Sequence, residues 1–420
     1  KRYGLGDFKI PRENYAGKLT LSAGIESSDI VACASSDALL HAVETGEPFM
    51  PQIIWLQSAN PLSCSGMDAP RMYEAINKIP YCVVADPFMT PTAVAHADIV
   101  LPVAMSCERN AVRTWWTPAP SISKCTTYYE AKSDEEIVVL LGNKMNPEFF
   151  QSKGISTDMD MLEYIVQQAP NHTWSFQDLY DGKADGKNYD WPDRPYYQYK
   201  TGGLRPDGQP GFATATGRIE LWCTMFANLG LEPMPKYEEP AESPVSTPEL
   251  FEKFPLVLTT GARNFEFFHS EQREQAHMRA TYPDPRVRIN PEDAKELGVS
   301  DNAWVWIEGK RGRCRQRALI TEGIMKGVVE AHHGWWFPEQ DGNAPHLFGA
   351  FDSNINNLTE NCNPGPYSFG ADFRSTLCKI YPCTPENSAV MPGTEVVVNG
   401  GFTKNPEYGN PAVAAYGEQQ

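Results

Sequence analysis

The chain has 420 residues, of which 41% are hydrophobic and 11% aromatic, and its formal net charge is −17. A chain of this length exceeds the size at which a single hydrophobic core stops growing, so two or three domains are expected. The acidic balance argues against a nucleic-acid partner, which usually needs a basic surface. No run of about 18 apolar residues occurs, so no transmembrane segment is expected.

The first residues, "KRYGLGDFKIPRENYAG", do not begin with Met and lack the apolar stretch of a secretory signal. We therefore expect the chain to start inside a longer protein. Helices and strands then alternate. Residues 37–46 predict a short helix, and residues 68–78 predict another with Asp68 as its N-cap. A third helix-like stretch covers 91–97.

Three apolar runs of the first half have the length of buried strands: 52–57, 81–85 and 98–102. Strands that alternate with helices over short loops are typical of a parallel sheet with helices on both faces. Beyond this sheet, Ser133 is expected to cap a helix with three acids in its first turn. Residues 170–213 predict a long segment without regular secondary structure, and "TGRIELW" (216–222) predicts a further strand.

Six prolines between Pro233 and Pro255 mark the clearest domain boundary. Beyond it the sequence predicts a β-barrel domain with one small helix at 291–298. Five short strands are expected there: 255–261, 286–290, 303–309, 314–320 and 327–334. The predicted fold class is thus α/β plus all-β, in three parts: an α/β domain over 1–235, a Pro-rich linker over 236–255 and a β-barrel domain over 256–420.

Arginines at positions 311, 313, 315 and 317 alternate along one predicted strand. Alternation of this kind is typical of the solvated face of a strand, although an anion site would show the same pattern. We expect the solvated face.

No metal-binding residues are predicted from spacing. The ten cysteines include no C-x-x-C pair and match no zinc or iron–sulfur framework. His332 and His333, in "EAHHGWWFPEQ", are adjacent in a predicted strand and should point to opposite faces, so they are poorly placed to hold one ion. The sequence also lacks a P-loop, a G-x-S-x-G motif and an H-E-x-x-H motif.

The order of several segments nevertheless resembles one family over nearly the whole chain. "QSANP", "VADPFMTPTAVAHADIVLPVAMSCERN", "ATATGRIELW", "TTGARNFEFFHSEQRE", "HHGWWFPEQ" and "SNINNLTENCNPGPYS" are similar to the dimethyl sulfoxide reductase superfamily. These enzymes use molybdenum or tungsten held by two pterin guanine dinucleotides. "HGWWFPE", "FFHSEQRE" and "DPFMTPTA" look most like the branch of acetylene hydratase and the catechol dehydroxylases.

The resemblance implies a Rossmann-like parallel α/β domain followed by a double-psi-type β-barrel. It implies a cofactor-binding part of an enzyme for two-electron oxidoreduction, or for oxygen or hydroxyl removal, on a small substrate. The alternatives are hydratase-type chemistry without net redox change and a non-catalytic cofactor-binding or assembly module.

The metal ligand and the cysteine motif for an iron–sulfur cluster, which relatives carry toward their N-termini, do not occur in this sequence. We expect the isolated chain to be inactive. Its partners would be the remaining N-terminal half, which would carry the iron–sulfur cluster, and an electron-transfer subunit. The compartment would be the prokaryotic cytoplasm, or an exported one if a twin-arginine signal precedes the chain.

The resemblance also implies cofactor contacts, and each has a plainer alternative. Gly261 would let the backbone approach a phosphate and Arg263 would pair with it, unless Arg263 is only a surface residue. His269 and Ser270 would add hydrogen bonds, unless His269 is structural. The remaining expected contacts in the barrel domain are His333, Gly334, Trp335, Asn356, Thr359 and Lys379.

These later residues also have alternatives: Trp335 could be core, Asn356 could serve a local turn and Lys379 could be solvated. In the α/β part, Asn60 follows a strand, where doubly wound sheets bind ligands. Asp86 also follows a strand and would accept two donors from a guanine edge. Thr90 completes the set of expected cofactor contacts.

Overall fold

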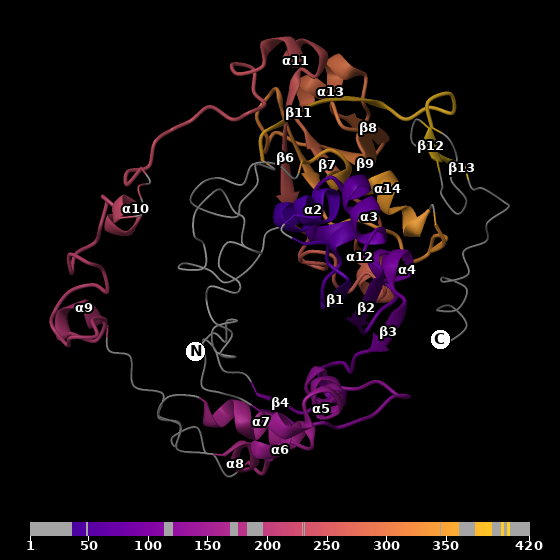
Figure 1. Ribbon diagram of the computed structural model, residues 1–420. Coiled ribbons are helices and arrows are strands. Elements are labelled where there is room, and N and C mark those ends of the chain that lie inside the picture. The colour runs from indigo at the N-terminus through magenta and orange to yellow at the C-terminus, as the bar shows by residue number, and fades with distance from the viewer. Residues whose placement is uncertain are drawn as a thin grey trace. The chain divides into compact units, whose positions relative to one another are not determined.

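The computed structural model describes most of the chain (Figure 1). Its described residues are 36–47, 49–112, 121–168, 175–182, 196–228, 230, 232–344, 346–360, 374–388, 396–398 and 401–403. They group into two compact units, one within 101–236 and one that combines residues up to 100 with those from 237 onward. Among the described residues, no helix has the length and apolar character needed to cross a lipid bilayer.

A three-stranded sheet of order β1-β2-β3 begins the larger unit. Its strands are β1 Ile53–Gln57, β2 Tyr81–Asp86 and β3 Ile99–Pro102, and β1 runs parallel to β2 with Ile53 opposite Tyr81. The accompanying helices are α2 Ser36–Thr45, η3 Pro61–Ser65, α3 Ala69–Asn77 and α4 Pro91–His96. The predicted alternation of strands and helices is confirmed.

Local capping chemistry explains where these helices begin. Asp68 accepts a hydrogen bond from the Arg71 amide at 3.4 Å, as the sequence predicts. Thr90 caps α4 through its hydroxyl, which accepts from the Ala93 amide at 3.3 Å. Apolar side chains of α2 and α3 then form a small core, with Leu40, Met72 and Ile76 almost fully buried.

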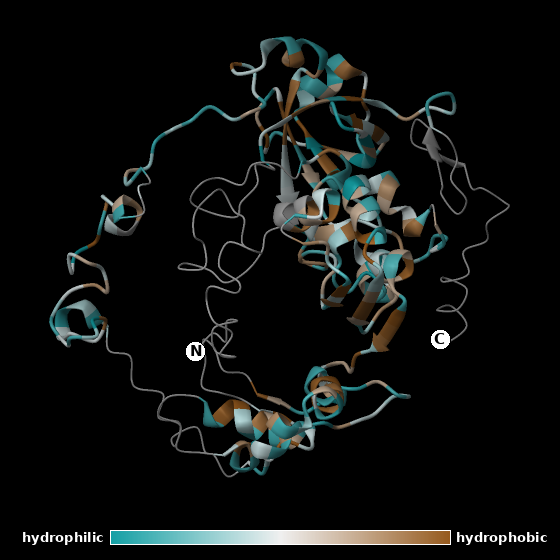
Figure 2. Ribbon diagram, viewed as in Figure 1, coloured by the Kyte–Doolittle hydropathy of each residue, from teal (hydrophilic) through white to brown (hydrophobic). Residues whose placement is uncertain are grey.

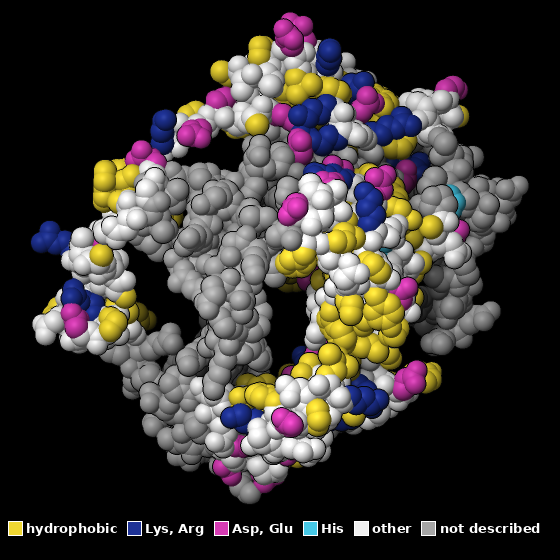
Figure 3. Space-filling view, viewed as in Figure 1, with side chains coloured by type: hydrophobic (Ala, Val, Ile, Leu, Met, Phe, Trp, Pro, Cys, Tyr) yellow, Lys and Arg dark blue, Asp and Glu magenta, His cyan; other side chains and the backbone are white. Residues whose placement is uncertain are grey.

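The opposite side of this sheet carries uncovered apolar side chains. Ile53, Tyr81 and Ile99 are 65%, 40% and 42% exposed. Figure 2 shows β3 in brown, and Figure 3 shows hydrophobic side chains gathered over the region of β1 to β3. These are the first residues of β1, β2 and β3, so this end of the face lacks cover among the described residues of its own unit; Val83 and Ala85, farther along β2, are buried.

Six strands close into a barrel in the order β10-β6-β11-β8-β9-β7. They are β6 Leu256–Ala262, β7 Arg286–Ile289, β8 Trp304–Glu308, β9 Arg313–Ile320, β10 Val328–His332 and β11 Thr376–Pro382. β6 pairs in parallel with β10 and β7 with β9, and the other pairs are antiparallel. Helix α13 Pro291–Leu297 contributes Ala294 to the barrel core. The predicted barrel is confirmed as a closed barrel.

Further elements lie outside the barrel and the first sheet. In the larger unit these are α11 Pro248–Lys253, α12 Ala276–Thr281, η5 Leu347–Gly349, α14 Ala350–Ser353, η6 Ile355–Asn357, β12 Val396–Val398 and β13 Gly401–Thr403. The smaller unit contains η4 Ser106–Glu108, β4 Ala111–Val112, β5 Ser121–Ile122, α5 Asp134–Met145, α6 Pro147–Ser152, α7 Asp158–Gln167, α8 Phe176–Tyr180, α9 Gln198–Thr201 and α10 Thr224–Asn228.

The smaller unit confirms one local prediction and corrects another. Ser133 caps α5 by accepting from the Glu136 amide at 3.0 Å. The strand predicted at 216–222 is wrong, because these residues form turns and irregular backbone. Ile219 and Leu221 are 69% and 78% exposed, so the apolar pattern there has no partner strand within the described part of the unit.

The solvated arginine face predicted along β9 is wrong for Arg315 and Arg317, although Arg313 is exposed as predicted. Arg315 and Arg317 are 1% and 5% exposed. Each pairs with an acid from a distant segment: Arg315 Nε lies 2.6 Å from Asp352, and Arg317 Nε lies 2.6 Å from Asp284. Buried guanidinium groups require such partners, and the local sequence around β9 does not contain them.

Candidate functional site

Two parallel barrel strands bring distant segments to one place. β6 and β10 pair in parallel, with Ala262 opposite His332 at their carboxyl ends. The segments that follow, 263–275 and 333–337, therefore leave the barrel at the same end. Gly261, just before the end of β6, has a φ of +92° and open space around its α-carbon.

Arg273 joins these two segments. Its side chain is 1% exposed, and its guanidinium donates to the Gly334 carbonyl at 3.0 Å and to the His269 carbonyl at 3.2 Å. The group also lies 4.0 Å from the ring centre of Trp335, a cation–π contact. Burial lowers the pKa of Arg273 to about 9. Arg273 was not predicted, because both its partners are backbone carbonyls.

Gly334 sits where the two segments approach each other most closely. It has a φ of +68°, and a Cβ at this position would lie 2.9 Å from the His269 carbonyl oxygen. Both facts require glycine. Trp335 follows with 1% exposure and packs edge-on against Phe267, with 5.6 Å between ring centres. Its ring belongs to the core of this region.

The two adjacent histidines diverge, as their strand positions predict. The His332 ring is buried, and its Nδ1 accepts from the Arg286 amide at 3.0 Å. Burial and the nearby arginines lower the pKa of His332 to about 3, so its ring is neutral. His333 instead meets His269 of the other segment, with 2.8 Å between His333 Nε2 and His269 Nδ1. Burial lowers the pKa of His269 as well.

Cys64 in η3 reaches the same pair of histidines. One ligand atom each of Cys64, His269 and His333 lie within 4.8 Å of one another. Burial raises the pKa of Cys64 to about 11; Glu271 adds to this, while Arg273 and a hydrogen bond with Ser270 oppose it. Sequence reasoning missed this cluster because its members come from three segments that are far apart in the chain.

The loop that follows β1 contains a second group of polar atoms. Thr92 donates from its hydroxyl to Asn60 Oδ1 at 2.6 Å and accepts from the Leu62 amide at 3.1 Å. Asn60 Nδ2 is buried and has no hydrogen-bond partner among the described residues. Asn60 therefore retains a free donor, whereas Thr90 uses its hydroxyl to cap α4.

Two buried carboxyl groups influence each other at the end of β2. Asp86 accepts from the Phe88 amide at 2.9 Å, and burial raises its pKa. Burial, with the nearby charge of Asp86, raises the pKa of Glu274 to about 7. Glu274 Oε1 is buried with no hydrogen-bond partner among the described residues. Glu274 was not predicted, since its carboxyl group lies beside Asp86 only in the folded chain.

The raised pKa of Glu274 predicts a pH-dependent stability. Its folded pKa lies above the ordinary value of 4.5, so this group favours the folded state below about pH 4.5. That contribution is lost as pH rises through about 7 and amounts to about 3 kcal/mol. We expect Glu274→Gln to remove this part of the loss of stability between pH 5 and 8, measured by urea unfolding. Glu252→Gln, at an exposed glutamate, is the control; an unchanged pH profile in Glu274→Gln would contradict the assignment.

A late segment of the chain holds the β1 loop in place. Asn356 Nδ2 donates to the carbonyls of Cys64 and Gly66 at 2.9 and 3.0 Å. The Thr359 carbonyl accepts from the Asp68 amide at 3.1 Å, while the buried Thr359 hydroxyl has no partner among the described residues. The Asn356 amide nitrogen is thus occupied by the loop, and the Thr359 hydroxyl remains available.

Comparisons with known proteins agree on one family. Residues 256–377 match the molydopterin dinucleotide binding domain. Dopamine dehydroxylase of Eggerthella lenta is 30% identical over 416 residues, covering 84% of this chain and 40% of that protein. Acetylene hydratase of Syntrophotalea acetylenica is 28% identical over 74% of this chain and 40% of that protein. The chain belongs to the dimethyl sulfoxide reductase superfamily.

A solved structure of this superfamily shares the fold. Acetylene hydratase from Pelobacter acetylenicus superposes with a TM-score of 0.71 at 24% identity, over 89% of this chain and 53% of that one. The chain thus spans about two fifths of the length of the curated relatives cited above. Within it, residues 256–377 form a molydopterin dinucleotide binding domain.

Two residues expected to meet the superfamily cofactor are not members of the cluster of Cys64, His269 and His333. The Arg263 guanidinium is exposed and lies 4.6 Å from the ring centre of Phe268. Arg263 acts electrostatically on Cys64 and His269, so it lies at the edge of the cluster. Lys379 Nζ on β11 pairs with Glu308 of β8 at 2.9 Å, so its charge is engaged on the wall of the barrel.

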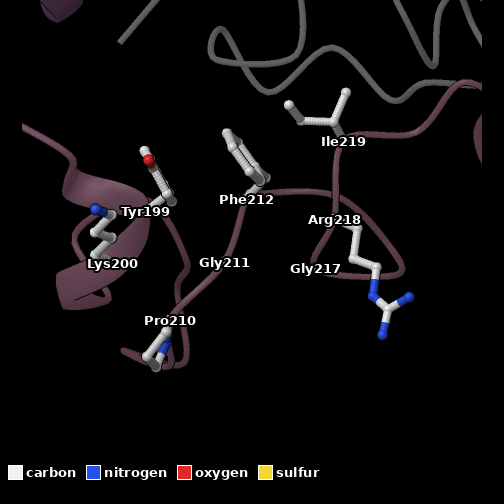
Figure 4. Close-up of a pocket in the computed structure, with 8 residues that line it drawn as sticks. All are labelled: Tyr199, Lys200, Pro210, Gly211, Phe212, Gly217, Arg218 and Ile219. Atoms are coloured by element: carbon white, nitrogen blue, oxygen red, sulfur yellow. The ribbon is translucent and has the colours of Figure 1, made fainter.

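The smaller unit has a hollow of its own, which the sequence did not predict. Tyr199 and Phe212 stack with 5.1 Å between ring centres and an interplanar angle of 10°. Figure 4 shows these rings side by side, with Lys200 next to Tyr199 and Arg218 pointing away from the rings. The hollow is open and contains none of the expected cofactor contacts of this superfamily.

Two polar loop residues of the smaller unit, Glu108 and Asn110, use their side chains in hydrogen bonds within that unit. Glu108 is buried and accepts from the amides of Met105 and Tyr128 at 2.9 and 3.0 Å. Asn110 accepts from the Lys124 amide at 3.0 Å and donates to Asp158 at 3.2 Å. Both side chains hold the loop together.

Proposed function

We propose that the larger unit holds a molybdopterin guanine dinucleotide of a molybdenum or tungsten enzyme. The whole enzyme would catalyse two-electron oxidoreduction, or remove an oxygen or hydroxyl group, on a small substrate. One observation carries the proposal: buried polar atoms without partners among the described residues follow the ends of β1 and β6, and another belongs to Glu274, which feels the charge of Asp86 at the end of β2. They occur in a chain whose residues 256–377 match a dinucleotide-binding domain.

The donor and acceptor atoms fit such a cofactor. Buried polar groups are normally hydrogen-bonded, so a set of unpaired ones indicates a missing polar partner. The set contains donors and acceptors, as a pterin and a guanine require: Asn60 Nδ2, Asn264 Nδ2, Glu274 Oε1 and Thr359 Oγ1. The open space at Gly261 would let the backbone approach a phosphate closely.

Each part of the cofactor then has residues suited to it. Asp86 and Glu274 would accept the N–H groups of the guanine edge, and Arg263 would pair with the pyrophosphate, with Lys379 as a further cation. The pterin edge would meet Asn60 and Thr359. Other residues would surround it at greater range: Thr90, His269, Ser270, His333, Gly334, Trp335 and Asn356.

When bound, the metal group supplies the two-electron or oxygen-transfer chemistry. The residues of this chain bind, orient and bury it. Arg273 holds the two loop segments together, and the neutral His332 fixes the end of β10 without adding charge. We also propose that the barrel has double-psi topology. The iron–sulfur cluster, the metal ligand and an electron-transfer subunit would come from the rest of the enzyme.

The similarity to acetylene hydratase favours a second candidate, hydration without net redox change. The oxidoreductase and hydratase activities are distinguished by assaying the longer protein, purified without oxygen, with catechols, N- or S-oxides and acetylene as substrates. Reduction of a catechol or an oxide would support the oxidoreductase, and conversion of acetylene alone would support the hydratase. A purified protein with neither metal nor pterin would overturn both.

The guanine assignment has its own test. Asp86→Ala should lower the guanine nucleotide released per polypeptide by acid treatment of the loaded enzyme about tenfold or more, because a charge-assisted pair is lost. Asp207→Ala, at an exposed acid of the smaller unit, is the matched control. An Asp86→Ala enzyme with a full nucleotide content would contradict the assignment.

A further inference from the structure

The cluster of Cys64, His269 and His333 carries an inference beyond the proposed function. We propose that these three side chains form a binding site for one divalent transition-metal ion of the zinc type, called here the Cys-His-His site. The proposal concerns an ion held by side chains of this chain alone. It does not depend on which pterin the enzyme carries.

The ligand types fit such an ion. Zinc and cobalt ions favour thiolate sulfur and imidazole nitrogen, and three protein ligands leave one tetrahedral position for water or an external ligand. Bond lengths of about 2.0–2.3 Å place tetrahedral ligand atoms roughly 3.3–3.7 Å apart. Here all three ligand atoms lie within 4.8 Å of one another, and His269 Nδ1 is 2.8 Å from His333 Nε2. Small side-chain rotations would bring them to the required spacing.

Hydrogen bonds that do not involve the ion fix the backbone around each ligand residue. His269 and Gly334, next to His333, are linked through Arg273, which donates to both their carbonyls. The Cys64 amide donates to the Asn60 carbonyl at 2.8 Å, and the Cys64 carbonyl accepts from Asn356 at 2.9 Å. A site whose backbone is already fixed loses less entropy when it binds.

The surroundings suit a cation that can enter and leave. All three ligand residues are half-buried, so an ion can reach them. The Glu271 carboxylate lies beside the site and accepts from the His269 amide at 2.8 Å, adding negative charge. Arg263 and Arg273 also act on Cys64, and their charges lower the pKa of its thiol against the larger effect of burial, which raises it. Ser270 contributes a hydrogen bond to the same sulfur.

The site is tested by titrating Co²⁺ into the 420-residue chain under a non-thiol reductant. We expect one equivalent to give a sulfur-to-cobalt charge-transfer band and the intense visible bands of tetrahedral cobalt, and Zn²⁺ to displace it. Cys64→Ser and His333→Gln should each lower the affinity by about 100-fold or more, since one of three ligands is lost. Cys125→Ser and His277→Gln, at exposed residues outside the cluster, should bind as the parent does.

A second measurement needs no substitution. Zn²⁺ should protect Cys64 from alkylation by iodoacetamide, followed by peptide mass spectrometry, while exposed Cys107 and Cys125 serve as internal controls. Equal labelling of Cys64 with and without Zn²⁺, or a Cys64→Ser chain that binds cobalt as the parent does, would overturn the proposal. Both experiments use the chain without pterin, so their failure leaves the proposed function to its own tests.

Discussion

Arg315→Met is expected to lower the free energy of unfolding by about 3–5 kcal/mol, because it leaves Asp352 buried without its cation. Arg315 Nε lies 2.6 Å from Asp352 Oδ2, and the two residues are 1% and 8% exposed. Burial raises the pKa of Asp352, and Arg315 opposes that rise. Removing the guanidinium therefore forces the carboxyl group to take up a proton or to remain charged in an apolar core.

The measurement is urea unfolding at pH 7. The double variant Arg315→Met, Asp352→Leu should recover most of the loss, because no buried charge remains. Arg313→Met, on the same strand but exposed, should change stability by less than about 1 kcal/mol. A double variant as unstable as Arg315→Met would show that packing, and not the unpaired charge, dominates at this position.

Gly334→Ala is expected to destabilise the chain by about 2–4 kcal/mol through two effects. A φ of +68° strains any residue with a Cβ, by about 1–2 kcal/mol. That Cβ would also lie 2.9 Å from the His269 carbonyl oxygen, so the two loop segments must separate. The contact between His269 and His333 should be lost with them.

A matched control separates the two effects. Gly327 has a φ of +80°, and a Cβ added to it would meet no atom within 4 Å, so Gly327→Ala should show the strain alone. Thermal unfolding measures the loss of stability in both variants, and the difference between the two losses is the steric contribution at Gly334. Equal losses at the two positions would mean that the close approach at Gly334 has no energetic role.

Local patterns predicted much of this fold because they depend on neighbouring residues. The strand and helix alternation of the first sheet follows from short apolar runs and from caps such as Asp68. Five of the six barrel strands likewise follow from apolar runs between turns, whereas β11 was not among the strands predicted from such runs. The strand predicted at 216–222 failed because an apolar run forms a strand only where a partner strand exists.

The candidate site was less predictable because its residues interact across long separations. Arg315 and Arg317 were assigned to solvent, since Asp352 and Asp284 lie outside their local sequence. Family resemblance pointed to Asp86 and His269, and the fold adds Glu274 and Cys64 beside them. No spacing rule within a single motif brings such residues together.

The hydrogen bonds from Asn356 to the β1 loop also constrain the order of folding. The two bonds span 292 and 290 positions of the sequence. The loop around Cys64 therefore lacks these hydrogen bonds until the barrel domain has been synthesised. Contacts of such high sequence separation form slowly and late. The loop around Cys64 should therefore become ordered only after the barrel has been translated.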